Sequence, residues 1–188
     1  MRETSLRAFN LLVGCPRERE KAAKSEVRYF IGDLLQDAEL LISFTNVSGL
    51  ITCWTSLDPF YVVHKLREFA LENPYQFRFG VRFTPLEYCV ESNLEVISRT
   101  ARHLLGKIGE NETFRVTVRR RQTNLENMEV VRAVAEEIPR KVNLDEPDKT
   151  IWVEIIGELT GVSVLNEERD ILSITSMKEE IERREFNQ

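Results

Sequence analysis

Glu112-Thr-Phe-Arg-Val-Thr-Val-Arg-Arg-Arg-Gln-Thr-Asn124 alternates apolar and polar residues and then runs through three consecutive arginines. Side chains on a β-strand point alternately to its two faces, so Phe114, Val116 and Val118 fall on one face. The opposite face carries Arg115, Thr117, Arg119 and Arg121. Guanidinium groups are planar and donate several hydrogen bonds in a fixed geometry that suits phosphate. The stretch therefore predicts a half-buried strand whose free face is suited to binding phosphate.

The charge of the chain is unevenly distributed. Its 188 residues carry a net charge of −5, which by itself argues against a nucleic-acid partner. Residues 76–121, however, hold nine Arg or Lys against five Glu, whereas residues 145–188 hold five Arg or Lys against twelve Asp or Glu. Phosphate binding depends on the local face rather than on the total charge. The distribution favours a basic surface around the arginine strand and an acidic C-terminal end.

Strands and helices alternate in the first part of the chain. Short apolar runs predict strands at 9–14, 40–44 and 50–54, with a turn between the last two. Helical spacing of apolar residues predicts one helix over 17–35 and another that begins after Asp58. We interpret the charged run at the start of the first helix as a solubilising face; it comprises Glu18, Arg19, Glu20, Lys21 and Lys24.

A further strand is predicted over 77–83, with its phenylalanines on one face and Arg78 and Arg82 on the other. The resulting order is strand, helix, strand, strand, helix, strand. That is the order of a ferredoxin-like split unit, in which two helices cover one face of an antiparallel sheet.

The second part opens with a predicted helix over 93–108, followed by the arginine strand. Asn124 or Asn127 is expected to cap the next helix, which ends near Arg140 and Lys141. This basic pair either compensates the helix dipole or contacts phosphate. Two more strands are predicted, at 150–156 and 161–165. After them Ile171, Leu172 and Ile174 can dock on a core, and residues 178–188 are either a frayed helix or disordered.

The chain therefore predicts an α+β protein with a ferredoxin-like unit over 1–90, an α/β domain over 91–170 and an acidic polar tail over 171–188. Three cysteines and two histidines lie at spacings that fit no metal or redox motif, so neither a metal nor a cofactor is expected. No Gly-rich phosphate loop or nucleophile elbow appears. Glu154 and Glu158 are better explained as solvated carboxylates than as an acid–base pair. We expect a cytoplasmic, non-enzymatic binding protein without a membrane segment.

Four segments of the second part resemble a THUMP domain. They are Thr113–Arg121, Glu129–Ala135, Val142–Asp148, and the pair Ile151–Ile156 and Gly161–Leu165. The preceding split unit resembles the ferredoxin-like domain that accompanies THUMP in tRNA-modifying proteins. Most THUMP proteins also carry a catalytic domain, and the residues after Leu165 are too few to form one. The chain thus resembles the stand-alone THUMP proteins, archaeal or eukaryotic, that assist tRNA acetylation.

This resemblance implies a function for the whole chain. It implies an adaptor that binds the acceptor stem and 3′ CCA end of tRNA. The adaptor presents the tRNA to a separate RNA cytidine acetyltransferase, which forms acetylcytidine in the D-arm. On this view RNA is bound by the basic residues Arg82, Arg115, Arg119, Arg120, Arg121 and Lys141. Phosphate contacts would set register and affinity, and single-stranded ends would be read by stacking and base edges.

Other functions remain open at this stage. The chain is alternatively an RNA-binding subunit that serves another tRNA-modifying enzyme, a free-standing enzyme on RNA, or a protein-interaction scaffold that never touches RNA. Salt-sensitive tRNA binding distinguishes the adaptor from the scaffold.

Overall fold

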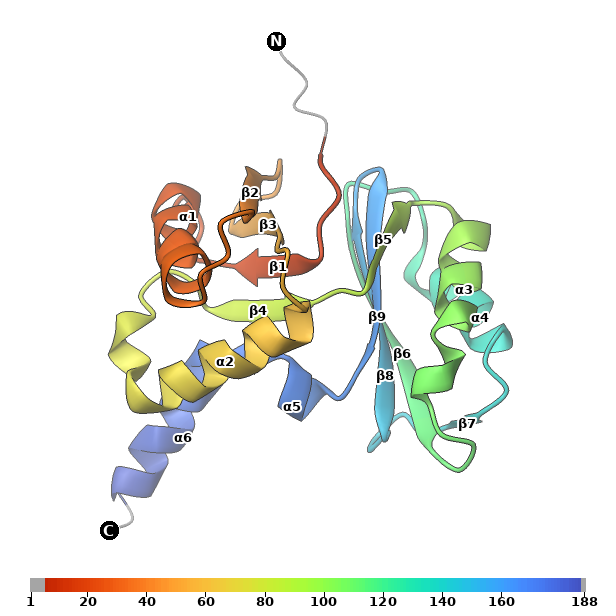
Figure 1. Cartoon of the computed structure of the whole chain (residues 1–188). Helices are drawn as coiled ribbons and strands as arrows, with labels where there is room; N and C mark the ends of the chain where they lie inside the picture. The colour runs from red at the N-terminus through yellow and green to blue at the C-terminus, as the bar shows by residue number, and fades with distance from the viewer. Residues whose placement is uncertain (1–5, 187–188) are drawn as a thin grey trace. The chain divides into compact units, whose positions relative to one another are not determined.

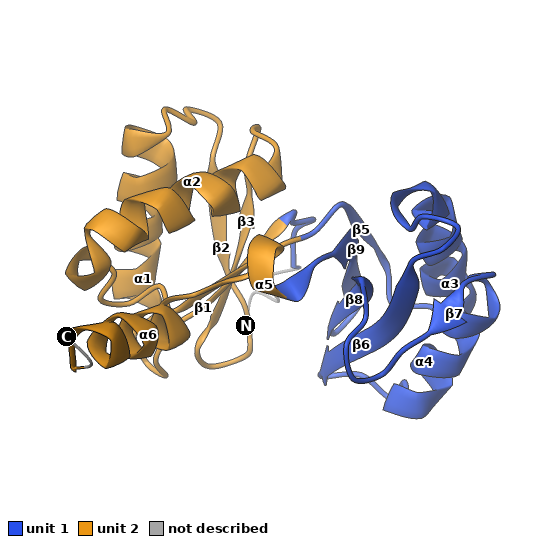
Figure 2. Ribbon diagram, turned by 90° about the horizontal axis from the view of Figure 1, so that it is seen from below, with its two compact units in different colours: residues 1–10, 86–167 blue, residues 11–85, 168–188 orange. Residues whose placement is uncertain are grey.

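A computed structural model describes residues 6–186 of the chain. The chain forms two compact units (Figure 2): one comprises residues 86–167 with the described part of 1–10, and the other comprises 11–85 with the described part of 168–188. Below they are called the 86–167 unit and the 11–85 unit. Each has its own five-stranded sheet and its own apolar core. No helix among residues 6–186 combines the length and apolarity needed to cross a bilayer.

The 11–85 unit packs its helices against one sheet (Figure 1). In chain order its elements are β1 (Leu11–Gly14), α1 (Glu20–Val27), the π-helical turn η1 (Arg28–Leu34), β2 (Leu41–Phe44), β3 (Leu50–Trp54), α2 (Pro59–Glu72), the 3₁₀ turn η2 (Pro74–Gln76) and β4 (Arg82–Pro85). With β10 (Leu172–Ser173) from the C-terminal segment, the strands lie in the order β10-β4-β1-β3-β2, and every neighbouring pair is antiparallel.

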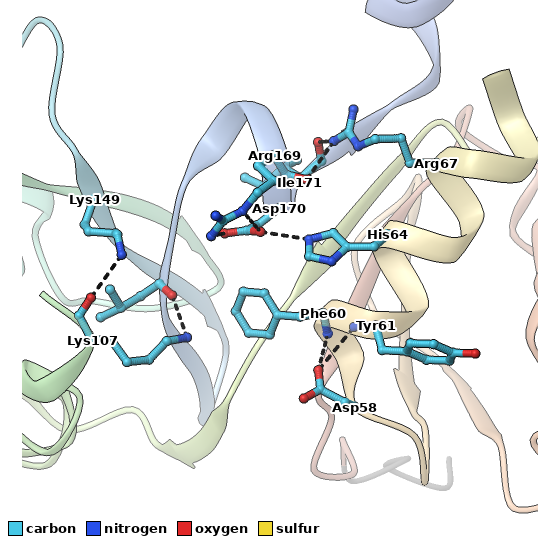
Figure 3. A network of polar contacts seen from close by, with 11 residues as sticks. Asp58, Phe60, Tyr61, His64, Arg67, Lys107, Lys149, Arg169, Asp170 and Ile171 are labelled. Atoms are coloured by element: carbon cyan, nitrogen blue, oxygen red, sulfur yellow. Dashed lines mark hydrogen bonds and ion pairs between the residues drawn. The ribbon is translucent and has the colours of Figure 1, made fainter.

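Local signals in the sequence explain where these elements begin. Helix α2 starts where the side chain of Asp58 accepts hydrogen bonds from the backbone N–H groups of Phe60 and Tyr61, at 2.8 and 3.2 Å (Figure 3). Pro59 occupies the first turn, where its missing N–H costs nothing. Both features agree with the helix predicted after Asp58.

The strand predicted over 77–83 is wrong for most of its length. Only Arg82 and Phe83 of that range belong to a strand, the beginning of β4. The carboxylate of Glu26 accepts hydrogen bonds from the successive N–H groups of Arg78, Phe79 and Gly80. Three adjacent N–H groups that bind one carboxylate cannot follow the alternating pattern of a strand. The alternation of phenylalanines was therefore a misleading signal.

Residues 168–186 belong to the 11–85 unit, where the sequence predicts a tail. Helix α5 (Glu167–Asp170) leads to the short strand β10 (Leu172–Ser173), which pairs with β4, and then to α6 (Ile174–Phe186). Ile171, Leu172 and Ile174, the three apolar residues that suggested docking, are all buried, and Met177 is buried with them, so docking of this segment is confirmed. The segment is thus a structural part of the unit.

Polar contacts fasten this segment to α2 (Figure 3). Nε2 of His64 lies 2.9 Å from Oδ1 of Asp170, a carboxylate that is only 2% exposed. One Nη of Arg67 donates to the backbone oxygens of Arg169 and Ile171, at 3.2 and 2.6 Å. Arg67 and His64 are on the same helix, so α2 holds the start of the segment at two points.

The 86–167 unit holds the arginine strand, β6, in a sheet of five strands whose middle strand is β8. Its elements are β5 (Tyr88–Glu91), α3 (Leu94–His103), the 3₁₀ turn η3 (Leu105–Lys107), β6 (Thr113–Arg121), α4 (Asn127–Glu136), β7 (Lys141–Val142), β8 (Lys149–Ile156) and β9 (Leu159–Leu165). The strand order is β5-β9-β8-β6-β7. β6 runs parallel to both β7 and β8, whereas β8–β9 and β9–β5 are antiparallel. The whole chain is therefore a mixed α/β protein, with two sheets and six α-helices among its described residues.

One face of this second sheet is covered by α3 and α4 (Figure 1). Phe114, Val116 and Val118 of β6 pack there against the apolar sides of both helices, as the alternation predicts. The predicted N-caps of α4 are wrong, because the helix begins after Glu126, whose N–H faces the carboxylate of Glu129 at 3.5 Å. Strands β5 and β7 have no counterpart in the sequence prediction.

Candidate nucleic-acid interface

The arginine strand is confirmed as β6, but its polar face is not an open comb of guanidinium groups. Residues Arg115, Thr117, Arg119 and Arg121 stand beside Thr150, Trp152, Glu154 and Ile156 of β8 in the parallel register. Trp152 and Glu154 are 1% and 2% exposed. The β8 part of this face is therefore buried, whereas on β6 Arg119 is exposed and the other polar residues are half-buried, so each arginine has a different environment.

Arg115 is engaged within the 86–167 unit. Its Nε and one Nη donate to Oε1 of Glu167, at 3.2 and 2.6 Å, and its other Nη donates to the backbone oxygen of Leu144 at 2.9 Å. The same Glu167 oxygen accepts from the hydroxyl of Thr150. Three donors of one guanidinium are thus directed at fixed internal acceptors, which is the pattern of a structural arginine.

Arg121 is engaged in the same way. Its Nη1 lies 2.6 Å from Oε2 of Glu154, and the other carboxylate oxygen accepts from the indole Nε1 of Trp152 at 2.8 Å. The side chain of Arg121 is 25% exposed. A buried carboxylate needs both a cation and hydrogen bonds to offset its lost hydration, and these two donors supply them. Arg121 therefore neutralises Glu154.

Arg119 and Arg120 are the exposed arginines of the strand. Cζ of Arg119 lies 5.3 Å from the ring centroid of Trp152, a cation–π contact that fixes the guanidinium without consuming its donors. Arg120 points to the opposite side of the strand, and one Nη is 3.5 Å from the exposed carboxylate of Glu126. Solvent-exposed pairs of this kind contribute little stability. These two cations remain available to a ligand.

Lys141 and Arg82 do not join this pair. Lys141 is exposed on β7, opposite Thr113 at the start of β6, so it is about 20 Å along the strand from Arg119. Arg82 belongs to β4 of the other unit, half-buried and in register with Gly14 and Ser173. Within the 86–167 unit Arg119 and Arg120 are neighbours in the chain on opposite sides of β6, and both are far from Lys141.

A basic row that runs from α1 into the first residue of η1 escaped the sequence prediction. Lys21, Lys24 and Arg28 follow one another at helical spacing, and Lys21 and Arg28 are exposed. The acidic residues between them turn away. The carboxylate of Glu20 accepts hydrogen bonds from the N–H of Gly49 and the hydroxyl of Ser48, and Glu26 binds the 78–80 backbone. In the run interpreted as a solubilising face, Glu18, Arg19 and Lys21 are exposed, and Glu20 is turned to Ser48 and Gly49, so exposed cations outnumber exposed acids. The sequence does not reveal this, because the N–H donors are distant in the chain. Gly49 lies 29 positions after Glu20, and Gly80 lies 54 positions after Glu26.

The bonds to Glu20 also shift its titration. Its pKa lies below the usual value chiefly because the Gly49 N–H donates to the carboxylate, with further help from its own N–H, that of Glu18 and the Ser48 hydroxyl. The Glu20 carboxylate is therefore ionised in the folded protein at neutral pH, and backbone N–H groups are its hydrogen-bond donors. It does not pair with the lysines of the row.

A hollow of about 670 Å³ opens where β6 and β8 end, within the 86–167 unit. Gln122, Asn124 and Glu158 contribute amide and carboxylate groups to its wall, beside Glu91 and Leu159. Gln122 has φ 56° and Gly157 has φ 58°, so both turns place their backbones in the left-handed region. Amides and carboxylates in a concave site offer donors and acceptors to the edge of an unpaired base.

Two buried cysteines have shifted thiol pKa values. Burial raises the pKa of the Cys53 thiol to about 12 and that of Cys15 to about 11, so neither is a ready nucleophile. Among residues 6–186, no three His, Cys, Asp or Glu side chains gather in a way that would hold a metal ion.

Comparison with protein families decides the nature of the 86–167 unit. Residues 91–165 match the model of the THUMP domain. This chain contains a THUMP domain. Its strand β6 carries Arg119 and Arg120, and the hollow lies at the end of the same strand.

The similarity to solved structures extends beyond the THUMP domain and covers most of this chain. PH1313 from Pyrococcus horikoshii Ot3 has a TM-score of 0.61 and 20% identity, over 88% of this chain and 55% of that one. TrmN from Thermus thermophilus has a TM-score of 0.56 and 20% identity, over 82% and 44%. A 4-thiouridine synthetase, solved as an RNA complex with bound ATP, has a TM-score of 0.51 and 15% identity, over 89% and 42%.

These similarities establish a shared fold. The chain spans about half the length of the solved proteins that it matches, 55% and 44% for the first two. A comparison with curated proteins gives no match. Similarity at 20% identity or less does not transfer the activity of those proteins to this chain.

Proposed function

We propose that this chain is a tRNA-binding adaptor that presents tRNA to a separate RNA cytidine acetyltransferase in the cytoplasm, for acetylcytidine formation in the D-arm. The observation that carries tRNA binding is the THUMP domain with two exposed arginines, Arg119 and Arg120, near the end of β6. Arg119 is oriented by Trp152 and keeps its donors free for phosphate. The THUMP-like fold shared with TrmN and with a 4-thiouridine synthetase supports a role in tRNA modification.

We further infer that the 11–85 unit is the ferredoxin-like partner of the THUMP domain. The antiparallel order β4-β1-β3-β2, with α1 and α2 as its two helices, supports this inference. The basic row Lys21, Lys24 and Arg28 gives this unit a surface of its own for RNA phosphates. Within the 86–167 unit, the hollow at the end of β6 offers amide and carboxylate groups suited to an unpaired RNA end.

Six residues were predicted from the sequence to bind RNA, and they now divide into three groups. Arg119, Arg120 and Lys141 are exposed and remain proposed phosphate contacts. Arg115 forms an ion pair with Glu167, and Arg121 forms one with Glu154. We therefore assign both arginines a structural role in holding β6 in place. Arg82 remains a proposed contact of the 11–85 unit.

Binding is tested by a gel shift of tRNA across a salt series, with the intact 3′ end and with CCA removed. We expect binding that weakens steeply with salt, because each phosphate contact releases a counterion, and weakens further without CCA. The double variant Arg119→Glu/Arg120→Glu should lower affinity at least tenfold. A matched control, Arg183→Glu/Arg184→Glu, changes net charge equally on α6 and should bind almost normally. If both double variants bind tRNA with the same affinity, Arg119 and Arg120 are not RNA contacts.

Presentation to an enzyme is tested by reconstitution. Purified chain, tRNA, acetyl-CoA and an RNA cytidine acetyltransferase are incubated together and separately, and nucleosides are measured by mass spectrometry. We expect acetylcytidine only when chain and enzyme are both present. Product formed by the chain alone would make it an enzyme.

Two alternatives give different results in these assays. If the chain serves another tRNA-modifying enzyme, as its fold similarity to TrmN and the 4-thiouridine synthetase also allows, tRNA binds but no acetylcytidine forms. If the chain is a protein scaffold, no tRNA binds at any salt concentration.

A further inference from the structure

Strand β2 ends the sheet of the 11–85 unit, and no strand among residues 6–186 pairs with its outer side. An outer strand presents unpaired N–H and C=O groups to solvent and can pair with another chain. Natural proteins usually block such edges with lysine, proline, a bulge or a covering segment. β2 reads Leu-Ile-Ser-Phe from Leu41 to Phe44, without a charged residue or proline. Its sequence therefore lacks the usual protection.

Large apolar side chains surround this edge. Leu41 is 49% exposed and stands opposite Trp54 of β3, which is 46% exposed, so the two form one apolar patch on one face of the sheet. Phe44 is 46% exposed at the other end of the strand. Exposed apolar groups gathered along one element are typical of a surface that binds a protein.

Charges of opposite sign lie at the two ends of β2. Glu39 is exposed just before the strand, and Asp33 is exposed at the end of the preceding helical turn. At the other end, Nζ of Lys24 lies 5.0 Å from the ring centroid of Phe44. Arg17 lies beside Gly49 in the turn after the strand, where the Gly49 N–H donates to Glu20, so two cations outnumber one carboxylate at this end. The edge thus runs from acidic to basic.

We propose that β2 pairs antiparallel with β2 of a second copy of this chain, about a two-fold axis, to make a continuous ten-stranded sheet. A two-fold axis brings the acidic start of each strand beside the basic end of its partner, so both ends are attractive at once. A partner of uniform charge would match only one end. The strand is four residues long, so the dimer is weak and forms at micromolar or higher concentration.

The first test uses the full chain and sedimentation velocity over a hundredfold concentration range, without RNA. We expect a monomer–dimer equilibrium. Leu41→Lys places a charge on the edge and should raise the dimer dissociation constant at least tenfold. Leu71→Lys is the control, because Leu71 is 58% exposed on α2 of the same unit and away from β2. A chain that stays monomeric throughout, or a dimer equally stable in both variants, overturns the proposal.

The second test uses the predicted charge symmetry. Glu39→Lys and Lys24→Glu each create two like-charge contacts in a symmetric dimer, so each variant alone should dimerise at least tenfold more weakly. Mixing the two variants restores both contacts, since the cation introduced in one chain would face the anion introduced in the other. We therefore expect heterodimers that are tighter than either homodimer. If mixing gives no gain, the pairing is not antiparallel through β2. Because these measurements need no tRNA, they succeed or fail independently of the proposed tRNA binding.

Discussion

Arg121 and Glu154 form an ion pair of 2.6 Å between strands β6 and β8, although the register places Glu154 beside Arg119. The carboxylate reaches two residues along the neighbouring strand, and Arg119 instead lies over the ring of Trp152. One buried acid thereby separates the arginines of β6 by role. Arg119, which is in register with Glu154, stays exposed, and Arg121, two residues further along β6, neutralises the carboxylate.

Removing Arg121 should destabilise the THUMP domain. Arg121→Ala leaves Glu154 buried with only the Trp152 N–H as a partner, and we expect a loss of about 2–3 kcal/mol in the free energy of unfolding. Urea unfolding followed by the fluorescence of Trp152, in a Trp54→Phe background, measures it. Arg120→Ala is the control, with an expected change below about 0.5 kcal/mol. If both variants unfold at the same urea concentration, the Arg121–Glu154 pair is not structural.

Arg119 and Arg120 should act as separate phosphate contacts. Each single alanine variant is expected to weaken tRNA binding and to reduce the slope of log affinity against log salt by about 0.7–0.9. Arg115→Ala should leave that slope unchanged, because its donors are directed at Glu167 and Leu144. Binding curves across a series of salt concentrations distinguish these cases. A slope that falls for Arg115→Ala alone would reverse the assignment.

The basic row of α1 and η1 should contribute to tRNA affinity. We expect Lys21→Glu/Arg28→Glu to weaken binding about tenfold or more, because it reverses two exposed charges on a surface whose acids face inward. Lys65→Glu/Arg183→Glu reverses two charges elsewhere in the same unit and serves as the control. Fluorescence anisotropy with labelled tRNA gives both values. Equal loss in the two variants would mean that only net charge matters.

Acid should weaken the 11–85 unit through Asp37. Burial opposes ionisation of this carboxyl, but hydrogen bonds from Ser56 and Thr55 outweigh it and hold its pKa below the ordinary 3.8. A depressed folded-state pKa stabilises the protein above the unfolded value and loses that contribution as pH falls below about 4. Asp37→Asn should therefore lower stability at pH 7 and flatten its fall between about pH 5 and pH 3. Thermal unfolding at several pH values measures this, and a parallel fall in both proteins would contradict it.

Truncation should test whether the C-terminal segment belongs to the 11–85 unit. A chain ending at Asp170 loses β10 and α6, and with them the buried side chains of Leu172, Ile174 and Met177. We expect the unit to lose its cooperative unfolding transition, because several kcal/mol of apolar burial disappear. A chain ending at Glu182 removes mostly exposed residues and should keep the transition. Proton NMR of methyl groups distinguishes a folded core from a collapsed one.

Alternation of residue type predicted β6 well, because burial of one strand face repeats every second residue. The same rule failed at 77–83, where Glu26, far away in the sequence, captures three successive N–H groups. Short strands such as β5 and β7 carry too few residues for a period to show. β10 is held by its pairing with β4, which sequence spacing does not reveal.

The candidate interface was predicted in part for the same reason. The sequence locates the arginines on one strand, and the structure agrees. Which of them are free depends on Glu154 and Glu167, which lie on elements that follow much later in the chain. The cationic character of α1 likewise depends on where Glu20 and Glu26 find their N–H donors. Tertiary contacts therefore determine which charges face solvent.

The division of the chain into interrupted units bears on its synthesis. Strand β10 closes the outer edge of β4, yet the whole of 86–167 is translated between them. At roughly 5–20 residues per second, the ribosome leaves β4 uncovered for several seconds, and an uncovered strand invites pairing with other nascent chains. Completion of the first-made unit thus waits until β10 and α6 have left the exit tunnel, so cellular yield should be more sensitive to chaperone supply than the stability of the finished protein suggests.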